Sequence, residues 1–278
     1  MNLGAGAKTI MSSLRSRFND NGVNGVALHV NGSNPSPGRT SDVLQVTTNR
    51  HPATRSNRKP IRISIWNVRT LFKKGLLDNV LREMGRLDIG VLGLYEVRWK
   101  EAGTFRKNDS TVIYSGGNKH QRGVGMILYK QTSKSLLWHW ALSDRVILVK
   151  IKGNPFNISI IQAYAPTSDA DDEIDSFFFN ETLDKAYNQY KSTEVKIVMG
   201  DINAKVGKGK VGSIVGPFGL GDRNDRGEKF IDWCARNHQV ITGTWFKHHP
   251  RRFYTWTRPG DRTRNQIDYI TIIVFVTL

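Results

Sequence analysis

The stretch from Glu194 to Asn203 constrains the fold of this chain most strongly. Its first part is rich in Val and Ile, which is typical of a short buried strand, and glycine and polar residues then end the run abruptly. Asp201 and Asn203 stand two residues apart where the strand leaves the sheet, so their side chains share one side of the backbone. The carboxylate and amide of the pair can hydrogen-bond a water and an anionic oxygen at the same time. Asp and Asn are also common turn formers, which is the alternative interpretation of the pair.

Four further apolar runs also carry one polar group near an end. The groups are Asn67 in residues 61–67, Glu96 in residues 89–96, Tyr164 in residues 158–166 and Asp268 in residues 265–270. Because five strands each bring one polar group near an end, we predict that these groups meet in a single polar cleft at one edge of the sheets.

The order and neighbours of these residues resemble the endonuclease/exonuclease/phosphatase superfamily, which includes apurinic/apyrimidinic endonucleases and pancreatic DNase. Within it, the chain resembles more closely the endonuclease domain of RTE-type non-LTR retrotransposons and their craniofacial development protein 2-like relatives. The resemblance covers roughly residues 60–272, and four phrases carry it: LYEVRW at 94–99, YAPT at 164–167, GDINAKVG at 200–207 and TRNQIDY at 263–269.

Periodicity predicts the remaining elements. Apolar residues at helical spacing indicate helices over 73–88, 169–190 and 226–237, the last capped by Asn224 or Asp225. Strands are expected at 111–114, 123–129, 135–142, 145–151, 157–164 and 239–243, with a hairpin at 252–258. Short turns between several strands favour antiparallel pairs. The expected fold is α/β (α+β), a four-layer sandwich of two mixed, largely antiparallel sheets flanked by helices.

The chain is strongly basic, with a formal net charge of +17 over 278 residues. Residues 1–59 hold scattered small, polar and basic residues without a sustained apolar period, so we predict a disordered basic tail followed by one domain over 60–278. Most of the excess charge lies in that domain. It points to a polyanionic partner, with nucleic acid first and an acidic membrane surface second, while basicity that only aids solubility is the plainer alternative.

The sequence limits the compartment and the assembly. A single cysteine, Cys234, rules out an internal disulfide framework and is expected to be a buried small hydrophobe. No signal peptide and no membrane-spanning stretch is recognisable, which favours the nucleus or the cytoplasm. We expect a monomer that binds DNA and does not associate with membranes.

The resemblance assigns roles to the polar groups. Glu96 is expected to bind Mg²⁺ or Mn²⁺, and a carboxylate at a strand end suits an ion that takes oxygen ligands and keeps several waters. Asn67 would help to position the metal, Tyr164 would contact the phosphate, Asp201 would orient or deprotonate the attacking water, and Asn203 would hold a phosphate oxygen. Arg69 stands where repair apurinic endonucleases carry an acidic metal ligand, so a repair-type metal site is not expected.

In the superfamily, the acid that matches Asp268 orients a catalytic histidine in a later Ser-Asp-His segment. The sequence given ends at Leu278 without that segment. The resemblance therefore implies impaired hydrolysis, because general acid–base groups commonly contribute about 10² to 10⁴-fold. It also implies that the last strand of the sheet is missing, which would leave an edge prone to aggregation.

The expected function is metal-dependent hydrolysis of DNA phosphodiester bonds. Two alternatives stay open: a catalytically dead fragment that binds DNA or a protein, and the same fold acting on abasic DNA, RNA or phospholipid. Loop cations that flank the predicted cleft are candidates for phosphate contact. They are Arg98, Lys205, Arg226, Arg252 and Arg264.

Overall fold

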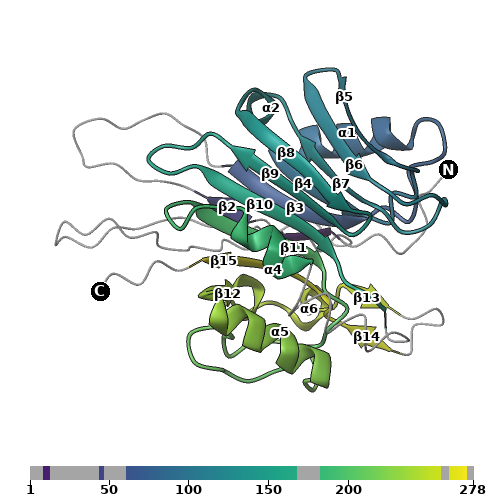
Figure 1. The fold of residues 1–278 in the computed structure, drawn as a ribbon. Helices are drawn as coiled ribbons and strands as arrows, with labels where there is room; N and C mark the ends of the chain where they lie inside the picture. Colours follow the sequence, from purple (N-terminus) through teal and green to yellow (C-terminus); the bar gives the residue numbers. More distant parts are fainter. Residues whose placement is uncertain (1–8, 13–43, 47–60, 168–181, 258–262, 274–278) are drawn as a thin grey trace.

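Two mixed β-sheets packed face to face form the centre of the protein in the computed structural model, which describes residues 9–12, 44–46, 61–167, 182–257 and 263–273 (Figure 1). Side chains from both sheets share one buried cluster. It includes Ile63 and Ile113 of the first sheet with Val149, Ile160 and Ile197 of the second. This shared apolar layer fixes the two sheets against each other.

The first sheet has the strand order β1-β3-β4-β7-β6-β5, and β2 also pairs with β3. Only β3 and β4 run parallel to each other among its pairs. The bounds are β1 Thr9–Ser12, β2 Leu44–Val46, β3 Ile61–Asn67, β4 Val91–Tyr95, β5 Ala102–Lys107, β6 Ser110–Ser115 and β7 Val124–Leu128.

The second sheet has the order β12-β15-β11-β10-β9-β8. Here β10 and β11 are the parallel pair, and the other neighbours are antiparallel. The bounds are β8 Leu136–Ser143, β9 Val146–Ile151, β10 Ile158–Tyr164, β11 Val195–Asp201, β12 Gln239–Ile241 and β15 Asp268–Ile273.

Helices cover the outer face of each sheet. Helix α1 (Leu76–Leu87) buries Val80 and Met84 against the first sheet. Helices α4 (Leu183–Asn188) and α5 (Asp225–Arg236) lie against the second sheet, where Phe230 and Trp233 are fully buried. Every residue of β10 and β11 is buried because both faces are covered, which explains their nearly continuous apolar sequences. The predicted four-layer sandwich is confirmed.

Several local predictions match the structure. The side chain of Asn224 accepts a hydrogen bond from the backbone N–H of Gly227 at 3.0 Å, so Asn224 is the cap of α5, and Cys234 is buried as expected. Helix α1 begins three residues later than predicted, at Leu76, after Gly75 in a left-handed conformation. Of the helix predicted over 169–190, only α4 is described, because residues 168–181 lie outside the described part of the chain.

Other local predictions are wrong. The segment predicted as a hairpin over 252–258 begins inside a helical turn, α6 (Pro250–Phe253), because proline is well suited to a first helical position. The strand that follows, β13 (Trp256–Thr257), pairs with β14 (Arg264–Asn265). The unpredicted elements include the edge strand β5, whose mostly exposed residues show no apolar alternation, and the short helix α2 (Gln131–Lys134).

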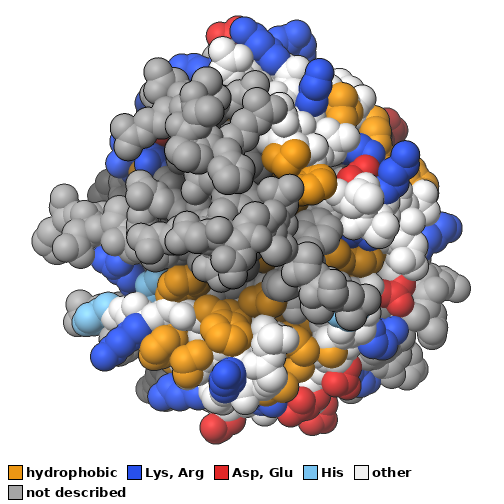
Figure 2. Space-filling model, turned by 90° about the vertical axis from the view of Figure 1, so that its left-hand side faces the viewer, with side chains coloured by type: hydrophobic (Ala, Val, Ile, Leu, Met, Phe, Trp, Pro, Cys, Tyr) orange, Lys and Arg blue, Asp and Glu red, His pale blue; other side chains and the backbone are white. Residues whose placement is uncertain are grey.

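The first sixty residues are described only at β1 and β2, both antiparallel to β3. The rest of the predicted disordered tail lies outside the described residues, and its disorder stays a prediction. Within the described ranges, no helix is long and apolar enough to cross a membrane. Figure 2 views the end at which β15 finishes, where Lys and Arg side chains are scattered round the periphery and hydrophobic side chains gather in the lower half.

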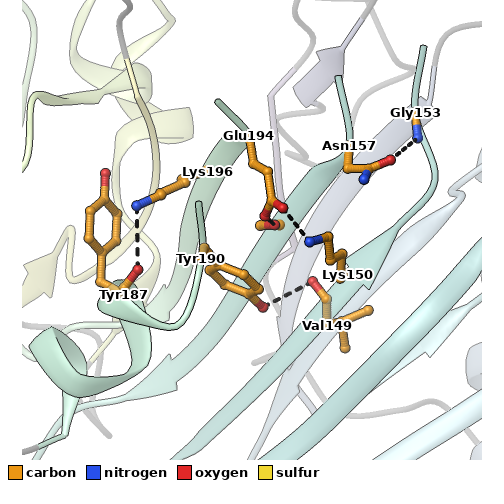
Figure 3. Close-up of polar contacts among 9 residues, drawn as sticks. Val149, Lys150, Gly153, Asn157, Tyr187, Tyr190, Glu194 and Lys196 are labelled. Atoms are coloured by element: carbon orange, nitrogen blue, oxygen red, sulfur yellow. Dashed lines mark hydrogen bonds and ion pairs between the residues drawn. The ribbon is translucent and has the colours of Figure 1, made fainter. Parts of the chain in front are cut away.

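A buried ion pair ties strands together at the start of β11. The carboxylate of Glu194 is buried, and it accepts hydrogen bonds from Lys150 on β9 and from the hydroxyl of Ser159 on β10. Nearby, the Tyr190 hydroxyl lies within hydrogen-bonding distance of two carbonyl oxygens, that of Val149 (Figure 3) and that of Ile160, each at 3.1 Å. This polar cluster fastens β9 and β10 to the segment between α4 and β11.

We predict that Glu194→Gln lowers the free energy of unfolding by about 1–3 kcal/mol, because the largely buried ammonium of Lys150 loses its charged partner. Urea denaturation followed by circular dichroism measures the change. The matched control is Glu228→Gln, which breaks an ion pair with Arg223. Because the Glu228 side chain is 57% exposed, this substitution should have almost no effect on the free energy of unfolding. Equal losses in the two variants would contradict a structural role for the buried pair.

Candidate active site

Strand registers bring the predicted site residues to one edge of the sandwich. Across the second sheet, Tyr164 pairs with Asp201 and Asp201 pairs with Asp268. Across the first sheet, Asn67 pairs with Tyr95, and Glu96 follows directly. The polar ends of β3, β4, β10, β11 and β15 therefore lie together, as the strand-end pattern predicted.

Glu96 is held by a polar partner on each carboxylate oxygen. The Asn67 amide Nδ2 donates to Oε1 at 2.8 Å, and the Arg98 guanidinium donates to Oε2 at 2.9 Å. The backbone of Glu96 is left-handed (φ 57°), which is uncommon for a residue other than glycine and is often found at functional sites. Since the side chain is 23% exposed, solvent still reaches the carboxylate.

Tyr95 links the two sheets at this edge. Its hydroxyl donates a short hydrogen bond to Oδ1 of Asp268, and its ring lies 5.7 Å, centroid to centroid, from the ring of Tyr164. Sequence reasoning missed Tyr95. The only available signal was a tyrosine directly before Glu96 at the end of a buried strand.

Asp201 and Asn203 leave β11 in the geometry that their spacing predicts. The backbone N–H of Asn203 donates to Oδ1 of Asp201 at 3.0 Å, and the Asn203 side-chain nitrogen donates to the carbonyl of Ala165 at 2.9 Å. Asn203 is left-handed (φ 50°), a conformation that asparagine adopts more readily than most residues. Its amide nitrogen carries a second N–H, which can donate a hydrogen bond to a ligand oxygen.

Tyr164 has a cationic neighbour that the sequence did not reveal. The guanidinium of Arg145 lies 5.7 Å from the ring centroid and donates to the carbonyl of Tyr164 at 3.2 Å. Burial raises the pKa of Tyr164 to about 12, with the charges of Glu96 and Asp201 adding to the rise and Arg145 opposing it. The phenol therefore stays protonated at neutral pH and can donate a hydrogen bond.

The two aspartates form a buried pair. Burial raises the pKa of Asp201 well above its usual range, and the charges of Asp268 and Glu96 raise it further, against the hydrogen bond from the Asn203 backbone. Burial also raises the pKa of Asp268 to about 6, while hydrogen bonds from Thr255 and Tyr95 hold it down. As the pH falls, this pair takes up protons earlier than isolated aspartates would.

Oxygen donors dominate the residues that could hold a metal. The described residues contain no cluster of three or more His, Cys, Asp or Glu side chains placed to cage an ion. Glu96 instead offers a carboxylate that solvent reaches, and Asn67 beside it offers an amide oxygen that accepts one hydrogen bond, from the backbone N–H of Arg69 at 2.8 Å, and has a second lone pair. This set fits Mg²⁺ or Mn²⁺, since such ions bind through one or two carboxylates together with waters and substrate phosphate.

The five candidate phosphate-contacting cations lie in different surroundings. Arg98 is exposed beside Glu96, and exposed Arg264 lies over the ring of Tyr254 at 4.7 Å. Lys205 and Arg252 are partly buried. Arg226 is buried, and its guanidinium donates to the carbonyls of Pro166 and Thr167. This position differs from the solvent-facing loop that the prediction assumed, because Arg226 lies in the first turn of α5 and anchors the segment after β10.

The fold and this edge define a class: an α+β sandwich of two facing mixed sheets with acidic, amide and phenol groups gathered where their strands end. Comparison with known proteins agrees. The Endonuclease/Exonuclease/phosphatase family matches residues 65–274, and the chain belongs to that family. It is also 40% identical over 209 residues to craniofacial development protein 2 of Bos taurus. That match covers 75% of this chain but only 35% of the relative.

Solved structures share the fold. The endonuclease domain of TRAS1, a telomere-specific non-LTR retrotransposon, superposes with a TM-score of 0.51 at 13% identity, covering 77% of this chain and 85% of that one. A variant of the 3′ phosphatase NExo from Neisseria, bound to a product DNA hairpin, gives 0.55 at 15% identity, covering 76% and 86%. At these identities the similarity concerns the architecture.

Proposed function

We propose that this chain is a nuclease domain that hydrolyses DNA phosphodiester bonds with Mg²⁺ or Mn²⁺ at the edge where β4, β10 and β11 end. One observation carries the proposal: Asn67, Glu96, Tyr164, Asp201, Asn203 and Asp268, which are far apart in the sequence, meet there. Family membership and the basic composition support it.

In this proposal, Glu96 and Asn67 hold the metal ion. When bound, the ion supplies Lewis-acid polarisation of the scissile phosphate and stabilises charge on the leaving oxygen. Tyr164 donates its phenolic hydrogen to a phosphate oxygen. Its pKa of about 12 keeps that hydrogen in place at neutral pH.

Asp201 accepts the proton of the attacking water. Its raised pKa makes the ionised carboxylate a stronger proton acceptor than an ordinary aspartate. Asp268, fixed by the hydroxyl of Tyr95, lies beside it and raises the basicity of Asp201 through its negative charge. Asn203 donates its second amide hydrogen to a phosphate oxygen.

A second candidate function is DNA binding without efficient turnover. The family resemblance pairs the acid at position 268 with a catalytic histidine. Among the described residues, the side chains that bond the Asp268 carboxylate are instead those of Tyr95 and Thr255. A missing acid–base group commonly lowers rates by about 10² to 10⁴-fold. Under this alternative, DNA binding should persist and weaken steeply with added salt.

Nicking of supercoiled plasmid, with Mg²⁺ and then with EDTA, tests the proposal. Nicking that EDTA abolishes supports a metal-dependent nuclease. Salt-sensitive binding without nicking supports the second candidate. Competition by abasic duplex, RNA and phospholipid vesicles tests whether DNA is the preferred substrate, and sedimentation of the same preparation tests the expected monomer.

We predict that nicking by the proposed site falls on acidification at a higher pH than an ordinary aspartate base would give. The pKa values of Asp201 and Asp268 are raised, so both acids are protonated at a pH where ordinary aspartates are ionised, and protonated Asp201 cannot accept a proton. In Asp268→Asn, Asp201 loses a negative neighbour and its pKa falls. The acid limb of the pH–rate profile should therefore move to lower pH. An acid limb at the same pH in wild type and Asp268→Asn would contradict the role of Asp201 as the proton acceptor.

A further inference from the structure

Beside the catalytic edge, we infer that Phe72 and His120 form a stacking site for an unpaired nucleobase of the DNA substrate. This inference rests on the proposed function and names a substrate class for it: DNA in which bases near the scissile bond are unpaired. Three segments build the site, namely the loop after β3, the loop between β6 and β7, and the residues that follow Glu96.

Phe72 is an exposed aromatic side chain on a fixed backbone. It is 64% exposed, more than any other large hydrophobic side chain in the described part of the protein. The backbone N–H of Leu71 donates to the carbonyl of Val97 at 3.0 Å, and that of Phe72 donates to the Thr70 hydroxyl at 3.1 Å. Because the ring is presented from an anchored turn, little conformational freedom is lost when a flat ligand covers it.

His120 sets the orientation of this aromatic pair and joins it to the site. Its ring meets that of Phe72 at 4.5 Å between centroids and 62° between planes, an edge-to-face contact that leaves ring surface open. Its Nδ1 lies 2.9 Å from the carbonyl oxygen of Arg98. Since Arg98 is also the ion-pair partner of Glu96, one residue, Arg98, connects the aromatic pair to the proposed metal ligand.

The surroundings of the pair are basic. Exposed cations from the same three segments flank it, and they are Arg69, Lys73, Lys74, Arg98, Lys119 and Arg122. Such cations attract the phosphate backbone without regard to sequence. Aromatic faces set among cations are the usual means of binding single strands, because every base has a face that can stack.

Geometry favours an unpaired base over a base pair. In duplex DNA, neighbouring bases cover both faces of each base. The ring of Phe72 therefore cannot stack on a base of a duplex unless that base first leaves its stack. Where bases are already unpaired, no such cost arises. Loss of one stacked base lowers affinity by about 5- to 150-fold.

The test measures affinity in EDTA, where no turnover is required, by fluorescence anisotropy with a duplex and with the same duplex carrying a run of unpaired thymines. We expect Phe72→Ala to weaken binding of the second oligonucleotide about 5- to 150-fold and to change duplex binding less than about threefold. Phe72→Trp should restore affinity. Leu137→Ala, which removes a side chain that is 48% exposed on β8, is the matched control and should change neither.

A chemical change in the DNA provides the complementary arm. Replacing one thymine at a time with 5,6-dihydrothymine, which is not flat, should weaken wild-type binding at one position and have no added effect there in Phe72→Ala. Equal losses on both oligonucleotides, or no loss, would overturn the stacking site. Absence of all DNA binding would overturn the inference together with the proposed function. Binding of the oligonucleotide with unpaired thymines without any Phe72 dependence, in a protein that nicks plasmid, would overturn the inference alone. Phe72-dependent binding without nicking would overturn only the catalytic proposal.

Discussion

Asp201→Asn is expected to lower the rate of DNA nicking by about 10² to 10⁴-fold while the protein stays folded. Asparagine has nearly the same shape, and its side-chain oxygen can still accept the backbone hydrogen bond from Asn203. The substitution also removes a buried carboxyl group that lies beside Asp268. The proton acceptor disappears, and the architecture of the edge does not depend on its charge.

Single-turnover nicking and a thermal melt of the same preparation separate the two effects. Asp232→Asn is the control, since Asp232 is exposed on α5 and belongs to no part of the site. The variant at 201 should melt within a few degrees of wild type, as should the control. An unchanged nicking rate in Asp201→Asn would remove Asp201 from the mechanism.

Gly200→Ala is expected to destabilise the protein by at least about 3 kcal/mol. A Cβ at this position would lie 1.8 Å from the carbonyl oxygen of Ala163 on the neighbouring strand, and the backbone φ of +144° is one that residues with side chains rarely adopt. The obstacle is backbone, so a rotamer change cannot relieve it. Since Gly200 directly precedes Asp201, relaxation of β11 would also displace the carboxylate.

The loss corresponds to a melting temperature about 6–12 °C lower in a protein of this size. Differential scanning calorimetry measures it. Gly243→Ala serves as the control, because the nearest atom to its added Cβ is Nε2 of Gln266 at 3.8 Å, an ordinary contact distance. A melting temperature equal to that of wild type in Gly200→Ala would contradict the close approach of β10 and β11.

Much of the candidate active site could be predicted from local sequence patterns. A run of Val and Ile that stops at a polar residue is set by burial of the strand, and the residue just past the end must lie at the sheet edge. That reasoning placed Asn67, Glu96, Asp201 and Asp268 together, and the register of β10, β11 and β15 then fixed which side chains are neighbours. The cap at Asn224 was equally local, since a capping side chain bonds within its own first turn.

Contacts between distant segments were not predictable from the same patterns. The hydrogen bond from Tyr95 to Asp268 joins residues 173 positions apart, and the cation over Tyr164 comes from Arg145 on a different strand connection. Arg226 was interpreted as a cation in a loop that flanks the cleft. Its burial depends on where the chain after β10 passes, which no local periodicity encodes.

The Mg²⁺ dependence of plasmid nicking, compared between wild type and Glu96→Gln, tests the central claim most directly. The account predicts that the wild-type rate rises to saturation with Mg²⁺ and falls to background in EDTA. It predicts that Glu96→Gln, which keeps the side-chain shape but removes the negative charge from the proposed ligand, needs at least about tenfold more Mg²⁺. Nicking that survives EDTA, or identical Mg²⁺ curves for the two proteins, would contradict it.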